Sequence, residues 1–167
     1  MKNVLTAAET FAAEQKIFDS GVDVMFLRMN AALAVADGLN ARAKGARTAI
    51  FCGKGGNGYD GILAAIRMKR TGCDVAIYLV FGDGGEISPA VRSARSEGVP
   101  VYDAKDFDGG ADIIVDAVFG IGLKREIAGD AKALIQKLNG IDAFKLAVDI
   151  PSGLDPDTGD VLGVCFK

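Results

Sequence analysis

The stretch TAIFCGKGGNGYDG, residues 48–61, joins a short apolar run to a glycine-rich turn and then to a segment with helical spacing. The apolar run is typical of a buried strand, and the segment from Gly61 to Arg70 is typical of a helix. Gly53, Gly55 and Gly58 fit the spacing GxGxxG, in which missing Cβ atoms let the backbone approach a pyrophosphate while helix amides face it. Taken alone, this spacing fits equally well a tight strand-to-helix turn with glycines at positive φ.

Short apolar runs alternate with amphipathic segments along most of the chain. The expected strands are Thr48–Cys52, Val75–Phe81, Val99–Tyr102, Ile113–Phe119 and Leu146–Ile150, and the expected helices are Gly61–Arg70, Ser88–Glu97 and Asp130–Leu138. Two more helices, broken near Gly21, are predicted between Thr6 and Ala43. Apolar strands separated by helices require a parallel sheet covered on both faces. The sequence therefore predicts a Rossmann-like three-layer α/β/α sandwich with a mostly parallel sheet and an N-terminal helical pair. Its ligands should bind beyond the carboxyl ends of the strands.

The composition favours one domain with a small-molecule ligand. Half of the 167 residues are hydrophobic, so we expect residues 1–167 to form one domain with its own core. A net charge of -3 with mixed signs argues against nucleic acid and against membrane binding. The absence of histidine excludes imidazole metal ligands and Ser-His-Asp triads. Cys52, Cys73 and Cys165 are widely spaced and form no CxxC pair, which fits a reducing cytoplasm.

A second motif, VDAVFGIGLKRE at residues 115–126, ends an apolar strand that contains Asp116. A carboxylate in such a run is costly to bury unless it is paired, hydrogen-bonded or bound to a cation. Asp116 is therefore a candidate functional residue. Lys124, Arg125 and Glu126 are, on their own, equally compatible with a solvated loop.

A third motif, AVDIPSGLDPDTG at residues 147–159, places Asp149 at the end of a strand. In a parallel sheet this position lies at the ligand-binding edge, and Pro151 and Gly153 restrict the turn that follows. A turn-forming role accounts well for Asp155 and poorly for Asp149.

Together, GKGGNGYDG, DAVFGIGL and VDIPSGLDPDTG resemble, in this order and spacing, the NAD(P)H-hydrate epimerase family, also called the YjeF N-terminal domain. The resemblance runs from the N-terminal helices to about Gly163. It implies a site for hydrated NADH and NADPH, called NAD(P)HX, and a potassium ion held by Asn57, Asp116 and Ser152, a hard-cation set of oxygen ligands. The substrate-binding residues that the resemblance implies are Gly56, Asn57, Gly58, Tyr59, Asp60, Gly120, Ile121, Gly122, Leu123, Lys124, Arg125, Glu126 and Asp149.

The same resemblance implies a homodimer and a fused or partner NAD(P)H-hydrate dehydratase domain. The sequence departs from the family pattern at three places: Gly56 replaces an asparagine, Tyr59 replaces a glycine, and Met29 replaces an acidic residue. The family domain also continues beyond the point where this sequence stops, so we expect a version shortened at the C-terminus.

The predicted activity is interconversion of the R and S forms of NAD(P)HX, with Asp149 as the catalytic acid–base residue. Lys124 and Asp60 are expected to position the ligand. Two alternatives stay open: the dinucleotide-binding domain of a redox enzyme, for which Asp83 is the only plausible ribose-binding acid, and a non-catalytic nucleotide-binding or scaffold domain.

Overall fold

The computed structural model describes residues 4–167, and for residues 40 and 41 it describes only the backbone. Residues 1–3 of the predicted domain lie outside this range. A parallel sheet with the strand order β3-β2-β1-β4-β5 forms the centre of the molecule. The strands are β1 (Arg47–Cys52), β2 (Asp74–Leu79), β3 (Val101–Asp103), β4 (Ile113–Ala117) and β5 (Phe144–Ala147). Because the strand order reverses between β1 and β4, a crevice is expected beyond their carboxyl ends.

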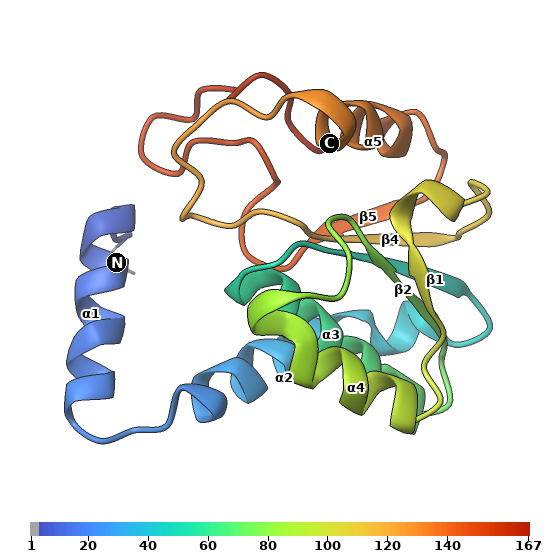
Figure 1. Cartoon of the computed structure of the whole chain (residues 1–167), viewed down its shortest axis with the longest axis horizontal. Helices are drawn as coiled ribbons and strands as arrows, with labels where there is room; N and C mark the ends of the chain where they lie inside the picture. The colour runs from blue at the N-terminus through green and yellow to red at the C-terminus, as the bar shows by residue number, and fades with distance from the viewer. Residues whose placement is uncertain (1–3) are drawn as a thin grey trace.

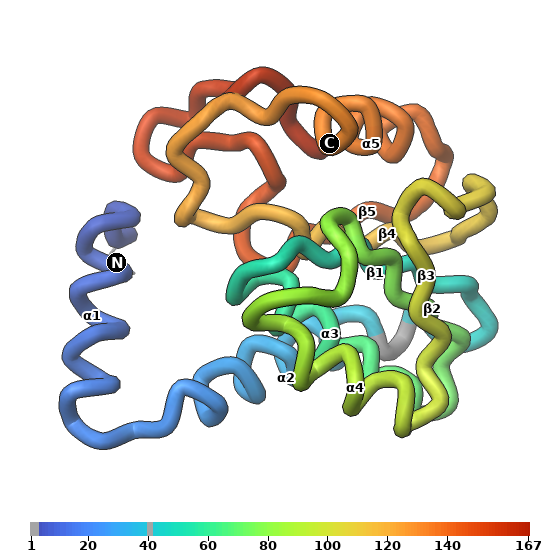
Figure 2. Tube along the Cα trace, viewed as in Figure 1, coloured from blue at the N-terminus to red at the C-terminus, as the bar shows by residue number. Residues whose placement is uncertain are grey.

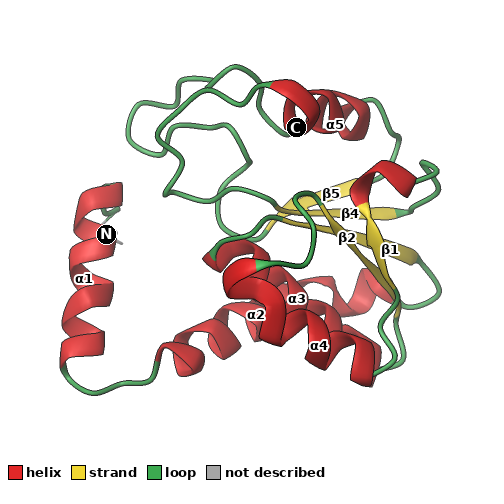
Figure 3. Ribbon diagram, in the orientation of Figure 1, coloured by secondary structure: helices red, strands yellow, loops and turns green. Residues whose placement is uncertain are grey.

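Helices cover both faces of the sheet, as Figures 1 and 3 show. α2 (Val24–Ala43), α3 (Gly56–Arg70) and α4 (Ser88–Ser96) cover one face, and α5 (Gly129–Asn139) covers the other. The short 3₁₀ helices η1 (Gly85–Ile87) and η2 (Ala104–Asp106) lie in connections. The predicted three-layer α/β/α fold is confirmed.

The two halves of the core follow from the alternation of side chains along the strands. On β1, Ile50 and Cys52 pack with α2, α3 and α4, whereas Ala49 and Phe51 pack on the face of α5. Both sets are buried, which explains why β1 reads as a continuous apolar run.

The N-terminal helical pair is also confirmed. α1 (Ala7–Asp19) begins with a capping box between Thr6 and Glu9, and α2 begins with Asp23 as its N-cap. α1 stands apart from the sheet and its covering helices, and Figure 2 shows the chain turning back between it and α2. Within residues 4–167 no helix is long and apolar enough to cross a membrane.

Several predicted boundaries were wrong by a few residues. α3 begins at Gly56 rather than Gly61, because the glycine-rich turn itself supplies the first helical turn. β4 ends at Ala117 because the next amides bond elsewhere: Phe119 N donates to Ser152 Oγ at 2.8 Å.

Two glycines of the first motif, Gly53 and Gly58, serve close packing rather than positive φ. None of Gly53, Gly55 and Gly58 has a positive φ. A Cβ on Gly58 would lie 2.0 Å from the carbonyl oxygen of Gly53, and one on Gly53 would lie 2.1 Å from that of Val118. The turn therefore excludes side chains because β1, β4 and α3 meet there.

Candidate functional site

A hollow of about 790 Å³ lies beyond the carboxyl ends of β1 and β4, within the size range of small-molecule sites. Three segments that are far apart in sequence meet there: the start of α3, the loop after β4 and the loop after β5. The sequence-predicted residues that line it are Gly56, Asn57, Asp60, Gly120, Ile121, Gly122, Leu123, Lys124, Arg125 and Asp149. The expected convergence of the strand-end motifs is thus observed.

Three predicted binding residues do not line this hollow. Gly58 is packed against Gly53, and Glu126 lines a neighbouring hollow instead. The Tyr59 ring is only 8% exposed and lies beneath the Arg28 guanidinium, 4.3 Å from its Cζ, in the core on the α3 side of the sheet. The aromatic replacement at Tyr59 therefore neither fills nor covers the hollow.

Asp149 presents an exposed carboxylate at the edge of the hollow. Its Oδ2 accepts a hydrogen bond from Ile121 N at 2.9 Å, which fixes the carboxylate against the loop after β4. Gly120 makes this approach possible, because a Cβ there would lie 2.4 Å from Asp149 Oδ2. The GxG spacing of the second motif thus positions the acid supplied by the third.

Asp60 is a second carboxylate in the hollow, and its environment favours the protonated form. Burial raises the pKa of Asp60 from 3.8 to about 6, partly opposed by Arg28, and Asp149, Glu14 and Glu86 add to the rise. Its Oδ1 is buried without a hydrogen-bond partner among the described residues. A carboxyl group with a pKa of about 6 beside a ligand hollow can exchange a proton near neutral pH.

Asp116 lies beneath this site, and its charge is met by protein groups. Ser152 Oγ donates to Asp116 Oδ1 at 2.6 Å, and Ser152 N donates to Oδ2 at 2.7 Å. Val118 N also donates to Oδ1, at 3.1 Å. Burial raises the pKa of Asp116, and these hydrogen bonds oppose the rise. The sequence left three ways to stabilise this buried carboxylate: an ion pair, hydrogen bonds or a bound cation. The structure shows hydrogen bonds.

Asn57 leaves a different question open. Both its Oδ1 and its Nδ2 are buried without a partner among the described residues. Such an amide costs free energy unless a water, an ion or a ligand completes its hydrogen bonds. Its side-chain oxygen is of the same kind as those of Asp116 and Ser152, and such oxygens are the ligands that a hard cation prefers, so the donor chemistry of the three residues fits the potassium ion that the resemblance implies.

Eight lining residues were not among the predicted binding residues, and four of them, Gly55, Val118, Phe119 and Val148, lie in or beside the three motifs. The other four belong to the N-terminal helices: Thr10, Phe11 and Glu14 of α1 and Ala31 of α2. No local motif marks them, because α1 reaches the hollow through tertiary contacts. One such contact joins Ala7 N to Asp157 Oδ1 at 2.8 Å, across 150 positions of sequence.

Asp83, the candidate ribose-binding acid of a redox domain, does not line the hollow. It follows β2 and forms an ion pair with Arg95 at 3.1 Å. The structure thus gives the redox alternative no additional support.

The chain is similar in sequence to a described protein family and similar in structure to a solved protein. The family model described as YjeF-related protein N-terminus matches residues 25–167. An NAD(P)H-hydrate epimerase from Levilactobacillus brevis is 38% identical over 149 residues, covering 86% of this chain and 69% of that protein. The crystal structure of yeast ynu0, YNL200c, matches with a TM-score of 0.86 at 21% identity, over 96% of this chain and 75% of that one, and shows the same fold.

Longer relatives match as well. The bifunctional NAD(P)H-hydrate repair enzyme Nnr of Archaeoglobus fulgidus is 36% identical over 140 residues, which cover 83% of this chain and 30% of the relative. The chain thus spans about a third of the length of this relative, and of a second one from Methanothermobacter thermautotrophicus, of which 33% is covered.

Proposed function

Because this chain belongs to the family of YjeF-related protein N-termini, we propose that it is an isomerase that interconverts the R and S forms of NAD(P)HX. The names of its relatives support this substrate: NAD(P)H-hydrate epimerases and bifunctional NAD(P)H-hydrate repair enzymes. The reaction would return damaged nicotinamide cofactors to the form that repair requires.

The observation that carries the proposal is that two carboxylates from separate motifs line one hollow. Asp149 and Asp60 both line it, beside the glycine-rich start of α3. Epimerisation at a hydroxylated carbon needs a positioned proton donor and acceptor, and negative charge that stabilises a transient cation. Two acids supply both requirements without a redox cofactor.

In NAD(P)HX the hydroxylated carbon adjoins the ring nitrogen. Protonation of the hydroxyl lets the C–O bond break with loss of water, while the nitrogen lone pair forms the C=N bond of an iminium ion. Water then adds to the opposite face and gives up a proton. Asp149 is the proposed acid–base group, since its Oδ2 is oriented by Ile121 N and its carboxylate faces the hollow. Asp60 and Lys124 are proposed to position the ligand.

We propose potassium as the cation of this site, held by Asn57, Asp116 and Ser152. The unpaired amide of Asn57 and the all-oxygen donor set support it. Positive charge there would offset the carboxylate of Asp116 beneath the hollow and would attract the pyrophosphate of the substrate.

The homodimer remains a proposal too, supported by exposed apolar side chains on the N-terminal pair. Phe11 of α1 is 43% exposed, and Phe26 of α2 is 59% exposed. We also propose a fused or partner NAD(P)H-hydrate dehydratase domain, and the bifunctional relatives support it. The cytoplasm is the proposed compartment, on the spacing of the three cysteines.

The test is to mix the protein with pure R-NADHX and follow formation of the S form against the spontaneous rate. Asp149→Asn keeps the size of the side chain but removes the carboxyl group that could donate a proton to the substrate and accept one from it. The rate should fall by about 10²–10⁴-fold while substrate binding changes little. Asp155→Asn is the matched control, because Asp155 Oδ1 accepts turn bonds from Asp157 N and Thr158 N at 2.9 Å.

Equal losses in both variants would contradict the assignment of Asp149. Binding of NADHX with no rate above the spontaneous one would favour the non-catalytic alternative. Hydride transfer from bound NADH would favour the redox alternative.

A further inference from the structure

A second hollow, of about 620 Å³, adjoins the first. The two share the wall residues Val118, Phe119, Leu123 and Arg125, so a ligand longer than one hollow can extend into the other. The second hollow differs in chemistry because its residues are mostly apolar. Its remaining lining residues are Lys54, Phe81, Glu126, Ile127, Ala128 and Ala131.

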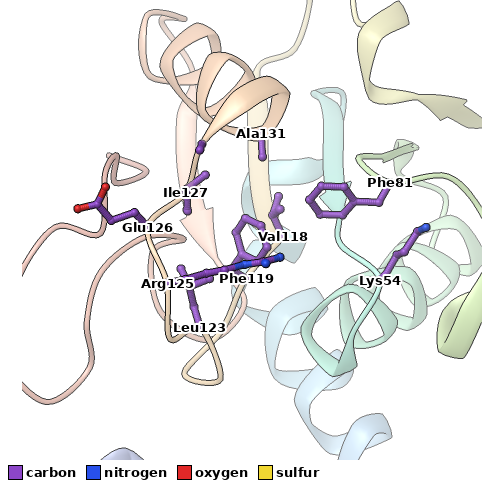
Figure 4. A pocket seen from close by; sticks show the side chains of 10 residues that line it. Lys54, Phe81, Val118, Phe119, Leu123, Arg125, Glu126, Ile127 and Ala131 are labelled. Carbon is purple, nitrogen blue, oxygen red and sulfur yellow. The ribbon is translucent and has the colours of Figure 1, made fainter.

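Two phenyl rings form part of its surface. Phe81, which follows β2, is 38% exposed, and Phe119 is half-buried. Their centroids lie 5.8 Å apart with planes inclined at 51°. Figure 4 shows the rings side by side, with Ala131 above them and Ile127 to the left of Phe119. Aromatic side chains left open in a concave surface are typical of sites for flat, apolar ligand groups.

Positive charge flanks the rings. In Figure 4 Arg125 lies beside Phe119 and Lys54 lies beyond Phe81, whereas the carboxylate of Glu126 points away from both rings. The first turn of α5 forms another wall, and its N-cap residue Ala128 provides no side-chain cap. An aromatic group that carries a phosphate would find both a stacking surface and compensating charge here.

We propose that this second hollow binds the adenine nucleotide half of the dinucleotide, an inference that rests on the function proposed above. Adenine is flat and aromatic, so it matches Phe81 and Phe119. The hydrated nicotinamide ring has a hydroxyl group and has lost its aromaticity, so it matches the hollow with Asp149 and Asp60. In this arrangement, Lys54 and Arg125 contact the phosphate groups that link the adenine nucleotide to the nicotinamide half.

The experiment measures binding of adenosine 5′-monophosphate to the whole chain by isothermal titration calorimetry, with no epimerase assay needed. Phe81→Ala removes one ring and should weaken binding by about tenfold, in the range found for a base stacked on an aromatic side chain. Lys54→Ala should weaken it several-fold, with a smaller loss at high salt. The matched controls are Phe144→Ala, with a ring 41% exposed at the start of β5, and Lys44→Ala, an exposed lysine at the end of α2.

Binding by the wild type that weakens in Phe81→Ala and Lys54→Ala but not in the controls supports the proposal. No binding of the monophosphate by the wild type overturns it, as does equal binding by all variants. The R-to-S conversion of NADHX is measured separately on the wild type. The two proposals can therefore fail separately. If the wild type shows no epimerase activity but binds the monophosphate, and only Phe81→Ala and Lys54→Ala weaken that binding, the proposed reaction is refuted and the nucleotide subsite is supported.

Discussion

Replacement of Asp60 by asparagine should stabilise the protein at neutral pH while it impairs the site. Burial, opposed by Arg28 and assisted by Asp149, raises the pKa of Asp60 from 3.8 to about 6. The folded protein therefore binds this proton more tightly than the unfolded chain, and the ionised carboxylate destabilises the folded state. Since Asp60 Oδ1 is buried without a partner, the substitution removes no hydrogen bond at that atom.

The magnitude follows from the same pKa. Each pKa unit corresponds to about 1.36 kcal/mol, so the full rise corresponds to about 3 kcal/mol. Asp60 is only half-buried, and solvent screens much of this cost, so we expect about 1 kcal/mol. The cost is absent below pH 3.8, where the carboxyl group is neutral in both states. It grows between 3.8 and about 6 and is complete above that pH.

The assay is urea denaturation of the wild type and Asp60→Asn at pH 4 and pH 8. In urea, the variant should be more stable than the wild type by about 1 kcal/mol at pH 8 and nearly equal in stability at pH 4. In a separate thermal melt at pH 8, its melting temperature should be about 2–4 °C higher. Asp142→Asn, an exposed carboxylate just before β5, is the control and should show no such pH dependence. A variant less stable than the wild type at pH 8, or a difference independent of pH, would refute this reasoning.

Four further predictions address the surroundings of the site. Ser152→Ala removes the hydroxyl that donates a hydrogen bond to Asp116 and accepts one from Phe119 N. Measured by urea denaturation, the free energy of unfolding should fall by about 2–3 kcal/mol. Ser96→Ala, which changes an exposed serine on α4, should have little effect. Gly120→Ala places a Cβ 2.4 Å from Asp149 Oδ2 and should reduce epimerisation at least tenfold, whereas Gly38→Ala, on α2 outside the hollow and with no atom within 4 Å of the new Cβ, should not; equal activities would show that the position of Asp149 is unimportant. Potassium chloride should raise the melting temperature by a few degrees above sodium chloride at equal ionic strength, and Asn57→Ala should abolish the difference; identical melting curves in both salts would exclude a selective site. Phe26→Glu should convert a dimer to a monomer in sedimentation velocity, while Val161→Glu, at a similarly exposed residue, should not; a monomeric wild type would refute the dimer.

Much of the fold was predictable because it rests on local periodicity. The apolar run at Thr48–Cys52 is buried from both sides in β1, and the glycine-rich turn leads directly into α3, as the pattern indicates. Errors were concentrated at element ends. The positive-φ explanation of the glycines was also wrong, because close approach between backbones, as at Gly53 and Val118, cannot be seen in a sequence.

For the site, the order of the motifs along a parallel sheet was enough to bring Asn57 and Asp149 to one edge, because parallel strands collect their carboxyl ends on the same side. The sequence also identified Asp116 as a carboxylate in need of a partner. Its actual partner, Ser152, lies 36 positions away and is chosen by the packing of the loop after β5.

The tertiary structure alone decided which way each side chain faces. It buried the ring of Tyr59 beneath Arg28, gave Asp60 its raised pKa and brought α1 to the wall of the hollow. It also set Phe81 and Phe119 side by side beyond two different strands. These features depend on distances and dielectric surroundings created when separate segments pack, whereas the sequence pattern records only the period and composition of each segment.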